Sequence, residues 1–251
     1  TDGMFQDCRS LSSVNIPDGV ASVGNNAFER CFNLQTVNIP NSVTSIGNCA
    51  FSGTFSLRTL NLPNSVRSIG ANAFNASGIT SINIPNSVTS IGEFAFNNTK
   101  GLTSVTLPNS VTKLGERIFK QSGLTSITVP GSVKNIEDAT CVFCGKLTSV
   151  RICEGIKTIG DAAFQDGWTL ETVSLPASLE YIDGWAFGNC PNLKIIECNG
   201  TTPPDIHSDA FINSDLTGVI LYVPKGSEPA YRNAPVWKNF PSIVASPPTA
   251  N

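Results

Sequence analysis

The segment 34–55 reads LQTVNIPNSVTSIGNCAFSGTF, and its pattern of apolar, proline, glycine and Ala-Phe positions recurs along most of the chain. Equivalent segments are spaced 22 or 23 residues apart and begin at Leu11, Leu57, Ile79, Leu102, Leu124, Leu147, Leu170 and Leu193. A partial copy precedes them, since Met4, Phe5 and Cys8 align with the corresponding residues of the next copy. A fixed period of this length is typical of solenoids, in which each repeat is one supersecondary unit.

Each repeat predicts two short extended pieces separated by a proline. In the segment 102–107, apolar residues stand at offsets 0, 3 and 5, and the last two share one face of a strand. Pro108 ends this piece because it has no N–H to donate, and the second piece, 111–114, returns apolar residues to the interior. A glycine column follows, where we expect a sharp turn that needs unusual φ angles. Its members are Gly24, Gly47, Gly70, Gly92, Gly115 and Gly160.

A phenylalanine column comes after the glycine column, and its Ala-Phe pair is predicted to lie in a short helical or irregular turn. The column takes ten of the fourteen Phe residues, at 5, 28, 51, 74, 96, 119, 143, 164, 187 and 211. One repeat cannot bury its apolar side alone, so stacked repeats must share one continuous core with these rings as its spine. The predicted fold is a β-rich solenoid of about nine turns with parallel strands and a C-terminal cap.

Regularity fails in two places. The stretch Ile136 to Phe143 aligns as two residues longer than its counterparts, with Glu137 in the place of the turn glycine. After Leu193 the pattern decays into a segment rich in aromatic residues, which we interpret as a cap over the last turn. We therefore expect the solenoid, beginning within a repeat, over 1–198, a terminal repeat and cap over 199–245, and a flexible tail over 246–251.

Composition excludes several classes of function. Charged residues make up 14% of the chain, and 16 Lys+Arg against 19 Asp+Glu give a net charge of −3. This balance provides no electrostatic footprint for nucleic acid or an anionic membrane, and no apolar run is long enough to span a bilayer. The first ten residues lack the basic-then-apolar layout of a secretory signal, so a signal was either removed or never present.

The eight cysteines and the single histidine are the residues best suited to chemistry. Cys8, Cys31 and Cys190 each lie three residues after a column Phe, where the simplest prediction is a small buried packing residue. Cys141 and Cys144 form a C-x-x-C motif, but no second such pair or His pair completes a zinc site. Structural thiols or a local disulfide are favoured, with a disulfide elsewhere and a metal or redox role as alternatives.

His207 is predicted on a surface loop, because a triad or metal centre would need other groups converging on it. No Gly-rich phosphate loop is present, since the glycines follow the repeat. We therefore predict no catalytic residue, cofactor site or metal site.

The outward positions of the first extended piece form columns along the solenoid. Offset 4 reads Asn15, Asn38, Asn61, Asn83, Thr106, Thr128, Arg151, Ser174 and Glu197, and offset 1 carries Arg58, Glu171 and Lys194 among Ser, Gln and Thr. One interpretation is mere solvation, since Thr and laddered Asn suit a flat parallel sheet. The other is a binding strip centred on Arg151, Glu171, Lys194 and Glu197 and extending to Arg58, although opposite charges there could equally pair with each other.

The consensus L-x-x-(V/I)-x-(I/L)-P-x-S-V-x-x-I-G-x-x-A-F-x-x-C resembles the BspA-like class of leucine-rich repeats, also known from a treponemal surface protein. The match runs from Phe5 to about Phe211. The closing segments CNGTTPP (198–204), LYVPKGS (221–227) and WKNF (237–240) look like the ends of such proteins in gut Bacteroidales. The resemblance implies a secreted or surface-anchored protein that adheres to host proteins or other cells, with any signal or anchor outside this segment, and offers no catalytic residues to carry over.

These observations predict a non-enzymatic extracellular binding module that recognises host or microbial proteins or glycans. A structural spacer that holds another domain away from the cell is the alternative, because uniform Ser, Thr and Asn faces permit it. A glycan-processing enzyme is disfavoured, since it would need converging carboxylates and no strand column clusters them beyond Glu171 and Glu197.

Overall fold

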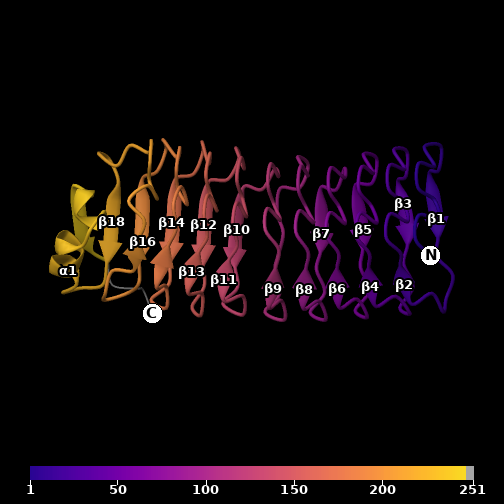
Figure 1. Ribbon diagram of the computed structural model, residues 1–251, viewed down its shortest axis with the longest axis horizontal. Coiled ribbons are helices and arrows are strands. Elements are labelled where there is room, and N and C mark those ends of the chain that lie inside the picture. The colour runs from indigo at the N-terminus through magenta and orange to yellow at the C-terminus, as the bar shows by residue number, and fades with distance from the viewer. Residues whose placement is uncertain (247–251) are drawn as a thin grey trace.

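The computed structural model describes residues 1–246 and shows an elongated solenoid, with the N-terminus at one end and helix α1 (Glu228–Asn233) at the other (Figure 1). The fold class predicted from the repeat is confirmed: stacked turns carry parallel strands and little helix. Of the predicted tail, Ser246 alone lies within the described residues, and its N–H donates to the carbonyl of Val223 at 2.7 Å.

Each regular turn contributes one short strand to each of two rows that run along the molecule (Figure 1). The first row contains β1 (Ser13–Asn15), β3 (Thr36–Asn38), β5 (Thr59–Asn61), β7 (Ser81–Asn83), β10 (Ser126–Val129), β12 (Ser149–Ile152), β14 (Thr172–Leu175), β16 (Ile195–Cys198), β18 (Ile220–Val223) and β19 (Ser242–Ala245). The second row contains β2 (Ser22–Val23), β4 (Ser45–Ile46), β6 (Ser68–Ile69), β8 (Ser90–Ile91), β9 (Lys113–Leu114), β11 (Asn135–Ile136), β13 (Thr158–Ile159), β15 (Tyr181–Ile182) and β17 (Asp205–Ile206).

Parallel pairing places equivalent residues of successive turns opposite each other. Val14 pairs with Val37 in the first row, and Ile46 pairs with Ile69 in the second. Where the first row has no strand in the turn between β7 and β10, a single parallel bridge joins Asn83 to Thr106. Like side chains therefore stack along the molecule, which makes the apolar interior continuous from turn to turn.

The third side of each regular turn, which follows the second-row strand, is an irregular segment that contains neither strand nor helix. Two residues four apart adopt positive φ angles there, as Asn72 (55°) and Ala76 (52°) do. Between them, alternate N–H groups donate to carbonyls of the next turn, including those of Asn72, Phe74 and Ala76 at 2.8 Å each. Of the two conformations expected for the Ala-Phe segment, the irregular turn is the one present, and these bonds between turns offset the cost of the left-handed residues.

The phenylalanine column forms a stack of nearly parallel rings through the core. Neighbouring rings from Phe5 to Phe119 lie 5.2–5.7 Å apart, and the stack resumes from Phe164 to Phe211 at 5.5 Å. The internal rings Phe51, Phe74, Phe96, Phe119, Phe164 and Phe187 are fully buried.

The assignment of Phe143 to this column is wrong. Phe143 is 40% exposed and has a positive φ of 59°, whereas Cys141 is fully buried and donates its N–H to Ala163, as column residues do. The turn therefore has no two-residue expansion: Thr140-Cys141 replaces Ala-Phe, and the ring stack is interrupted for one turn. Glu137 occupies the glycine position of this turn, as predicted from the sequence.

The physical reason proposed for the glycine column is also wrong. None of its six members has a positive φ. A Cβ at Gly47 would instead lie 2.7 Å from the amide nitrogen of Asn25, and one at Gly70 would lie 2.6 Å from that of Asn48. Glycine is favoured in these six turns because the backbone of the preceding turn passes close to where a Cβ would lie, whereas the turns of Glu137 and Asp183 admit a side chain at the same position.

Aromatic side chains cover the C-terminal end of the stack. Phe211, the last column ring, meets Trp237 and Phe240 edge-on at 6.4 and 5.4 Å. Trp237 and Tyr231 are fully buried, and each donates a hydrogen bond to a backbone carbonyl of the segment 200–204. β19 then pairs in parallel with β18 and closes the first row.

Candidate binding surfaces

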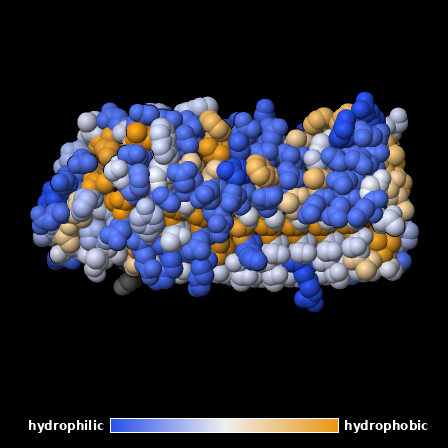
Figure 2. Space-filling view, in the orientation of Figure 1, coloured by the Kyte–Doolittle hydropathy of each residue, from blue (hydrophilic) through white to orange (hydrophobic). Residues whose placement is uncertain are grey.

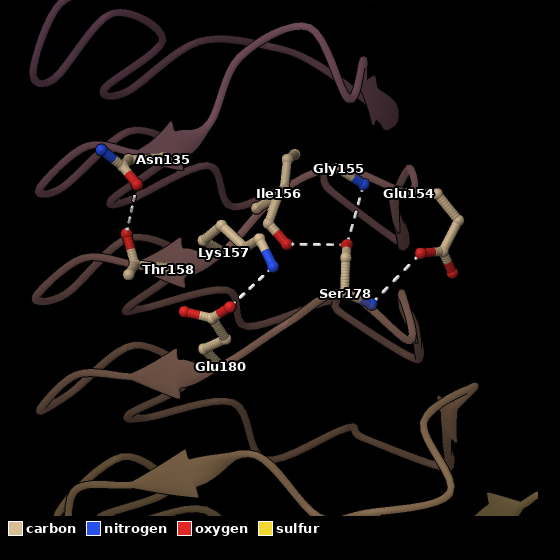
Figure 3. Close-up of polar contacts among 8 residues, drawn as sticks. All are labelled: Asn135, Glu154, Gly155, Ile156, Lys157, Thr158, Ser178 and Glu180. Carbon is tan, nitrogen blue, oxygen red and sulfur yellow. Dashed lines mark hydrogen bonds and ion pairs between the residues drawn. The ribbon is translucent and has the colours of Figure 1, made fainter.

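Three charged groups on the second-row side, Glu154, Lys157 and Glu180, are satisfied by their neighbours (Figure 3). Lys157 Nζ contacts Glu180 Oε1 at 2.6 Å, and the Glu154 carboxylate accepts N–H groups from Ala177 and Ser178. The Ser178 hydroxyl in turn accepts from the Gly155 N–H and donates to the Ile156 carbonyl. These contacts hold successive turns together and leave little free capacity to bind a partner.

The face of the molecule that carries both rows of strands shows a hydrophobic stripe between the first row and the second (Figure 2). The apolar residues that follow the first-row strands, among them Ile39, Leu62 and Ile84, are at most 8% exposed. The stripe is therefore the edge of the core, too little exposed to be an apolar docking patch.

The first-row face carries the predicted binding strip. Arg151 and Glu197 are exposed at offset 4, as expected, and Ser174 separates them in the register of β12, β14 and β16. The outward side chains of these strands, together with Ser126 and Thr128 of β10, line a shallow hollow of about 450 Å³. Neither Arg151 nor Glu197 has an ion-pair partner among residues 1–246.

The structure brings the other members of the strip together only in part. Lys194 Nζ lies 2.8 Å from Glu171 Oε1, so these two charges satisfy each other. Arg58 lies four turns towards the N-terminus from Arg151, and its guanidinium donates to the carbonyl of Gly78 at 3.3 Å. The predicted strip thus consists of three separate parts: the two unpaired charges of Arg151 and Glu197, the ion pair of Lys194 and Glu171, and the distant Arg58.

All eight cysteines are free thiols, so structural thiols are the alternative that the structure contains. Cys31 and Cys190 are fully buried as predicted, and burial raises their pKa values to about 11 and about 12. Cys8, expected to be buried with them, is exposed. Hydrogen bonding to Cys144 together with complete burial raises the pKa of Cys141, which disfavours the reactive thiolate.

His207 is exposed, as predicted, and its Nδ1 accepts the N–H of Asp209 at 3.1 Å. Among the described residues, no group of three or more His, Cys, Asp or Glu side chains is placed to hold a metal ion.

Three exposed aromatic side chains were not anticipated as surface features. Phe55, Phe143 and Trp168 are 53%, 40% and 52% exposed, and they lie in the loops that lead into first-row strands. The sequence signal was available for two of them, because Phe55 and Trp168 stand two residues before the first apolar position of a repeat, outside every core column.

Comparison with known proteins agrees with this architecture. The model of the BspA type leucine rich repeat region matches in six copies, over residues 1–125, 67–194 and 112–225. A leucine rich cell surface protein from Faecalibacterium prausnitzii is 31% identical (TM-score 0.51), over 79% of this chain and 62% of that one. The chain therefore spans less than two thirds of that protein.

Two further solved structures are similar to the chain. A leucine rich repeat protein of T. pallidum is 31% identical over 63% of this chain and 77% of its own, with a TM-score of 0.58. The pneumococcal vaccine antigen PcpA is 20% identical over 94% of this chain and 79% of its own (TM-score 0.52), which shows likeness of fold alone. No curated protein matches the chain.

None of the helices among residues 1–246 has the length and apolar character needed to cross a lipid bilayer.

Proposed function

The chain belongs to the BspA-type leucine-rich repeat family, and on that premise we propose that it is a non-catalytic module that binds a protein partner outside the cell. The extracellular or surface location is supported by the likeness to the Faecalibacterium protein, which is a leucine rich cell surface protein. A stack of identical turns is suited to this role because it presents a long, rigid surface with fixed spacing.

The observation that carries the proposal is the hollow on the first-row face. Its floor consists of small Ser and Thr side chains, and the unpaired charges of Arg151 and Glu197 lie two strands apart across it, roughly 10 Å by the usual strand spacing. A partner with an acidic group opposite Arg151 and a basic group opposite Glu197 would satisfy both charges. Lys194 and Glu171 contribute less, because binding would first have to break their ion pair.

The spacer alternative is supported by the N-terminal turns. Their outward side chains are uncharged asparagines, and one pair of them is joined, since the Asn38 amide donates to Asn15 Oδ1 at 2.7 Å. These turns therefore present no charged group at this column to a partner.

A charge-exchange experiment separates the two functions. We would measure adhesion of the purified chain to immobilised extracellular matrix proteins and to whole cells, with Arg151→Glu/Glu197→Lys as the test variant. Exchange of the two signs keeps the net charge constant and should weaken adhesion at least tenfold without altering the Tm. Lys157→Glu/Glu180→Lys, which makes the same exchange on the second-row side, should stay within twofold of wild type.

Adhesion that survives the exchange at Arg151 and Glu197 would eliminate this hollow as the binding site. Absence of adhesion by the wild-type chain to every surface tested would favour the spacer.

A further inference from the structure

The loops that lead into the first-row strands form one edge of the solenoid, along the top of Figure 1. In the 23-residue turns these loops contain one more residue than in the 22-residue turns. The additional position lies two residues before the first apolar residue of the repeat, and its occupants are Phe32, Phe55, Lys100, Gly145, Trp168 and Pro191. The edge is therefore uneven, with raised loops beside shorter ones.

The shorter loops are drawn in against the preceding turn. Gly78 and Gly123 occupy them, and a Cβ at either would overlap the carbonyl oxygen of Phe55 or Lys100 respectively. Their N–H groups donate to the carbonyls of Thr54 and Thr99 at 3.0 and 3.1 Å. Each shorter loop thus leaves a notch, and the two notches are two turns apart, roughly 10 Å.

Lys100 lies between the notches and lines both. The first notch has a volume of about 240 Å³, with Phe55 and Arg58 on its other side. The second has a volume of about 450 Å³, with Phe143, Lys146 and Trp168 on its other side. Each notch therefore has an exposed aromatic ring and a cation on one side and the shared Lys100 on the other.

The charge along this edge is of one sign. Between Thr54 and Thr169 its loops carry Arg58, Lys100, Lys120 and Lys146. Their only carboxylate is Asp166, which is 7% exposed and accepts a hydrogen bond from the Asn189 amide. A chain with a net charge of −3 thus presents a cationic edge, which favours an anionic ligand.

A buried hydroxyl in the first notch is also without a partner. Ser77 lines this notch and is 5% exposed, and its Oγ makes no hydrogen bond with any described residue. A buried polar atom left in this way is costly, unless a ligand or water completes its hydrogen bonding. The equivalent hydroxyl of the second notch, on Ser122, lies 3.3 Å from Cys144 Sγ.

The aromatic rings of Phe55, Phe143 and Trp168 are exposed enough for a ligand to stack on them. Phe143 and Trp168 lie 6.4 Å apart with their planes tilted by 58°, and the Lys120 ammonium lies 6.0 Å from the Phe143 ring centroid. An exposed aromatic face beside a cation can stack the apolar face of a pyranose ring while the cation binds an attached carboxylate or sulfate.

We propose that this edge binds a linear acidic polysaccharide, whose sugar rings stack on Phe55 and Trp168 while Lys100 and its cationic neighbours bind the acidic groups. The two notches are spaced like alternate sugars of an extended chain, which matches a polymer whose acidic group recurs every second residue. Nucleic acid fits less well, because four cations on a chain of isoelectric point 5.2 provide little of the basic surface that it needs. The proposal goes beyond the hollow around Arg151 and can fail independently of it.

Binding to immobilised polysaccharides tests the proposal directly. The ligands are heparin as a sulfated chain, hyaluronate as a carboxylated chain whose acidic group recurs on every second sugar, an unbranched neutral β-glucan and single-stranded oligothymidylate. The wild-type chain should bind at least one of the two acidic polysaccharides, more weakly in 0.5 M than in 0.05 M NaCl, and neither the neutral glucan nor oligothymidylate comparably.

Variants assign the binding to the edge. Lys100→Glu and Trp168→Ala should each weaken binding about tenfold with an unchanged Tm, because both side chains are exposed. The control Lys134→Glu makes the same charge change at an exposed site on the second-row side and should alter binding less than twofold. The idea fails if neither acidic polysaccharide binds, if oligothymidylate binds equally well, or if Lys134→Glu weakens binding as much as Lys100→Glu.

Discussion

The phenylalanine column shows how one residue type, repeated at a fixed spacing, produces a core. Each ring stacks on the equivalent ring of the next turn at 5.2–5.7 Å, so each internal ring buries both of its faces. Removing such a ring leaves a cavity between two neighbours that the backbone ladders hold in place.

The column predicts opposite outcomes for two phenylalanines that lie in successive turns. Phe119→Ala should lower the free energy of unfolding by about 3–5 kcal/mol, because Phe119 is fully buried. Phe143→Ala should cost less than about 1 kcal/mol, since that ring is 40% exposed and outside the stack. Guanidinium denaturation followed by circular dichroism measures both. Equal losses would show that Phe143 contributes to the core after all.

Position in the period, more than residue type, determines which side chain enters the core. Cys141 follows Phe119 by 22 residues and precedes Phe164 by 23, so it keeps the repeat length, whereas Phe143 does not. Matching Phe to Phe required two extra residues and produced the error. The constant spacing was therefore a better guide than the side chain, and it was present in the sequence.

At the scale of the element, the close approach of the preceding turn favours glycine as the residue that follows a second-row strand. The glycine column was readable from the sequence, but its cause was not, because a close approach between turns is a tertiary contact. Pairing of opposite charges within the strip was an open alternative in the sequence, and Lys194 and Glu171 do pair because the register places them in neighbouring turns.

The close approach predicts an unusual effect of alanine. In an open site with ordinary φ, Gly→Ala stabilises a protein by about 0.4–1 kcal/mol, and Gly218→Ala should do so because nothing lies within 4 Å of its added Cβ. Gly47→Ala should instead destabilise the chain by about 1–3 kcal/mol, since its Cβ would meet the backbone of Asn25 and Gly24. Thermal melts of the two variants give the comparison. A stabilised Gly47→Ala variant would mean that the turns can move apart at little cost.

At the scale of the whole molecule, charge is divided between the two edges of the irregular third side. Between Thr54 and Thr169 the edge leading into the first row is cationic, whereas the edge that follows the second row carries carboxylates on successive turns. These are Glu93, Glu116, Glu137, Asp138, Asp161 and Asp183. Arg117 pairs with Glu116 at 2.6 Å, which neutralises only part of this charge. The division gives the solenoid a cationic edge despite its acidic composition.

The acidic edge makes stability depend on pH. Burial raises the pKa of Glu137, and the neighbouring carboxylates of Asp138 and Glu116 raise it further. Burial likewise raises the pKa of Asp161, with Asp138 and Asp183 adding to the effect. Because the folded state then holds a proton more tightly than the unfolded state, stability falls as pH rises from the unfolded value of about 4.3 for Glu through the raised value.

Glu137→Gln removes one of these charges and should therefore stabilise the chain at pH 7. Since the site is partly exposed, the expected gain is about 0.5 kcal/mol, equivalent to a Tm about 1–2 °C higher for a chain of this length. The gain should shrink as pH falls and vanish below about pH 4, where Glu137 is protonated in both states. Melting curves from pH 4 to 8 measure it, with Glu197→Gln on the first-row face as the charge-matched control. A gain that is constant across this range, or equal in the control, would contradict repulsion along the acidic edge and leave the net charge of the chain as its cause.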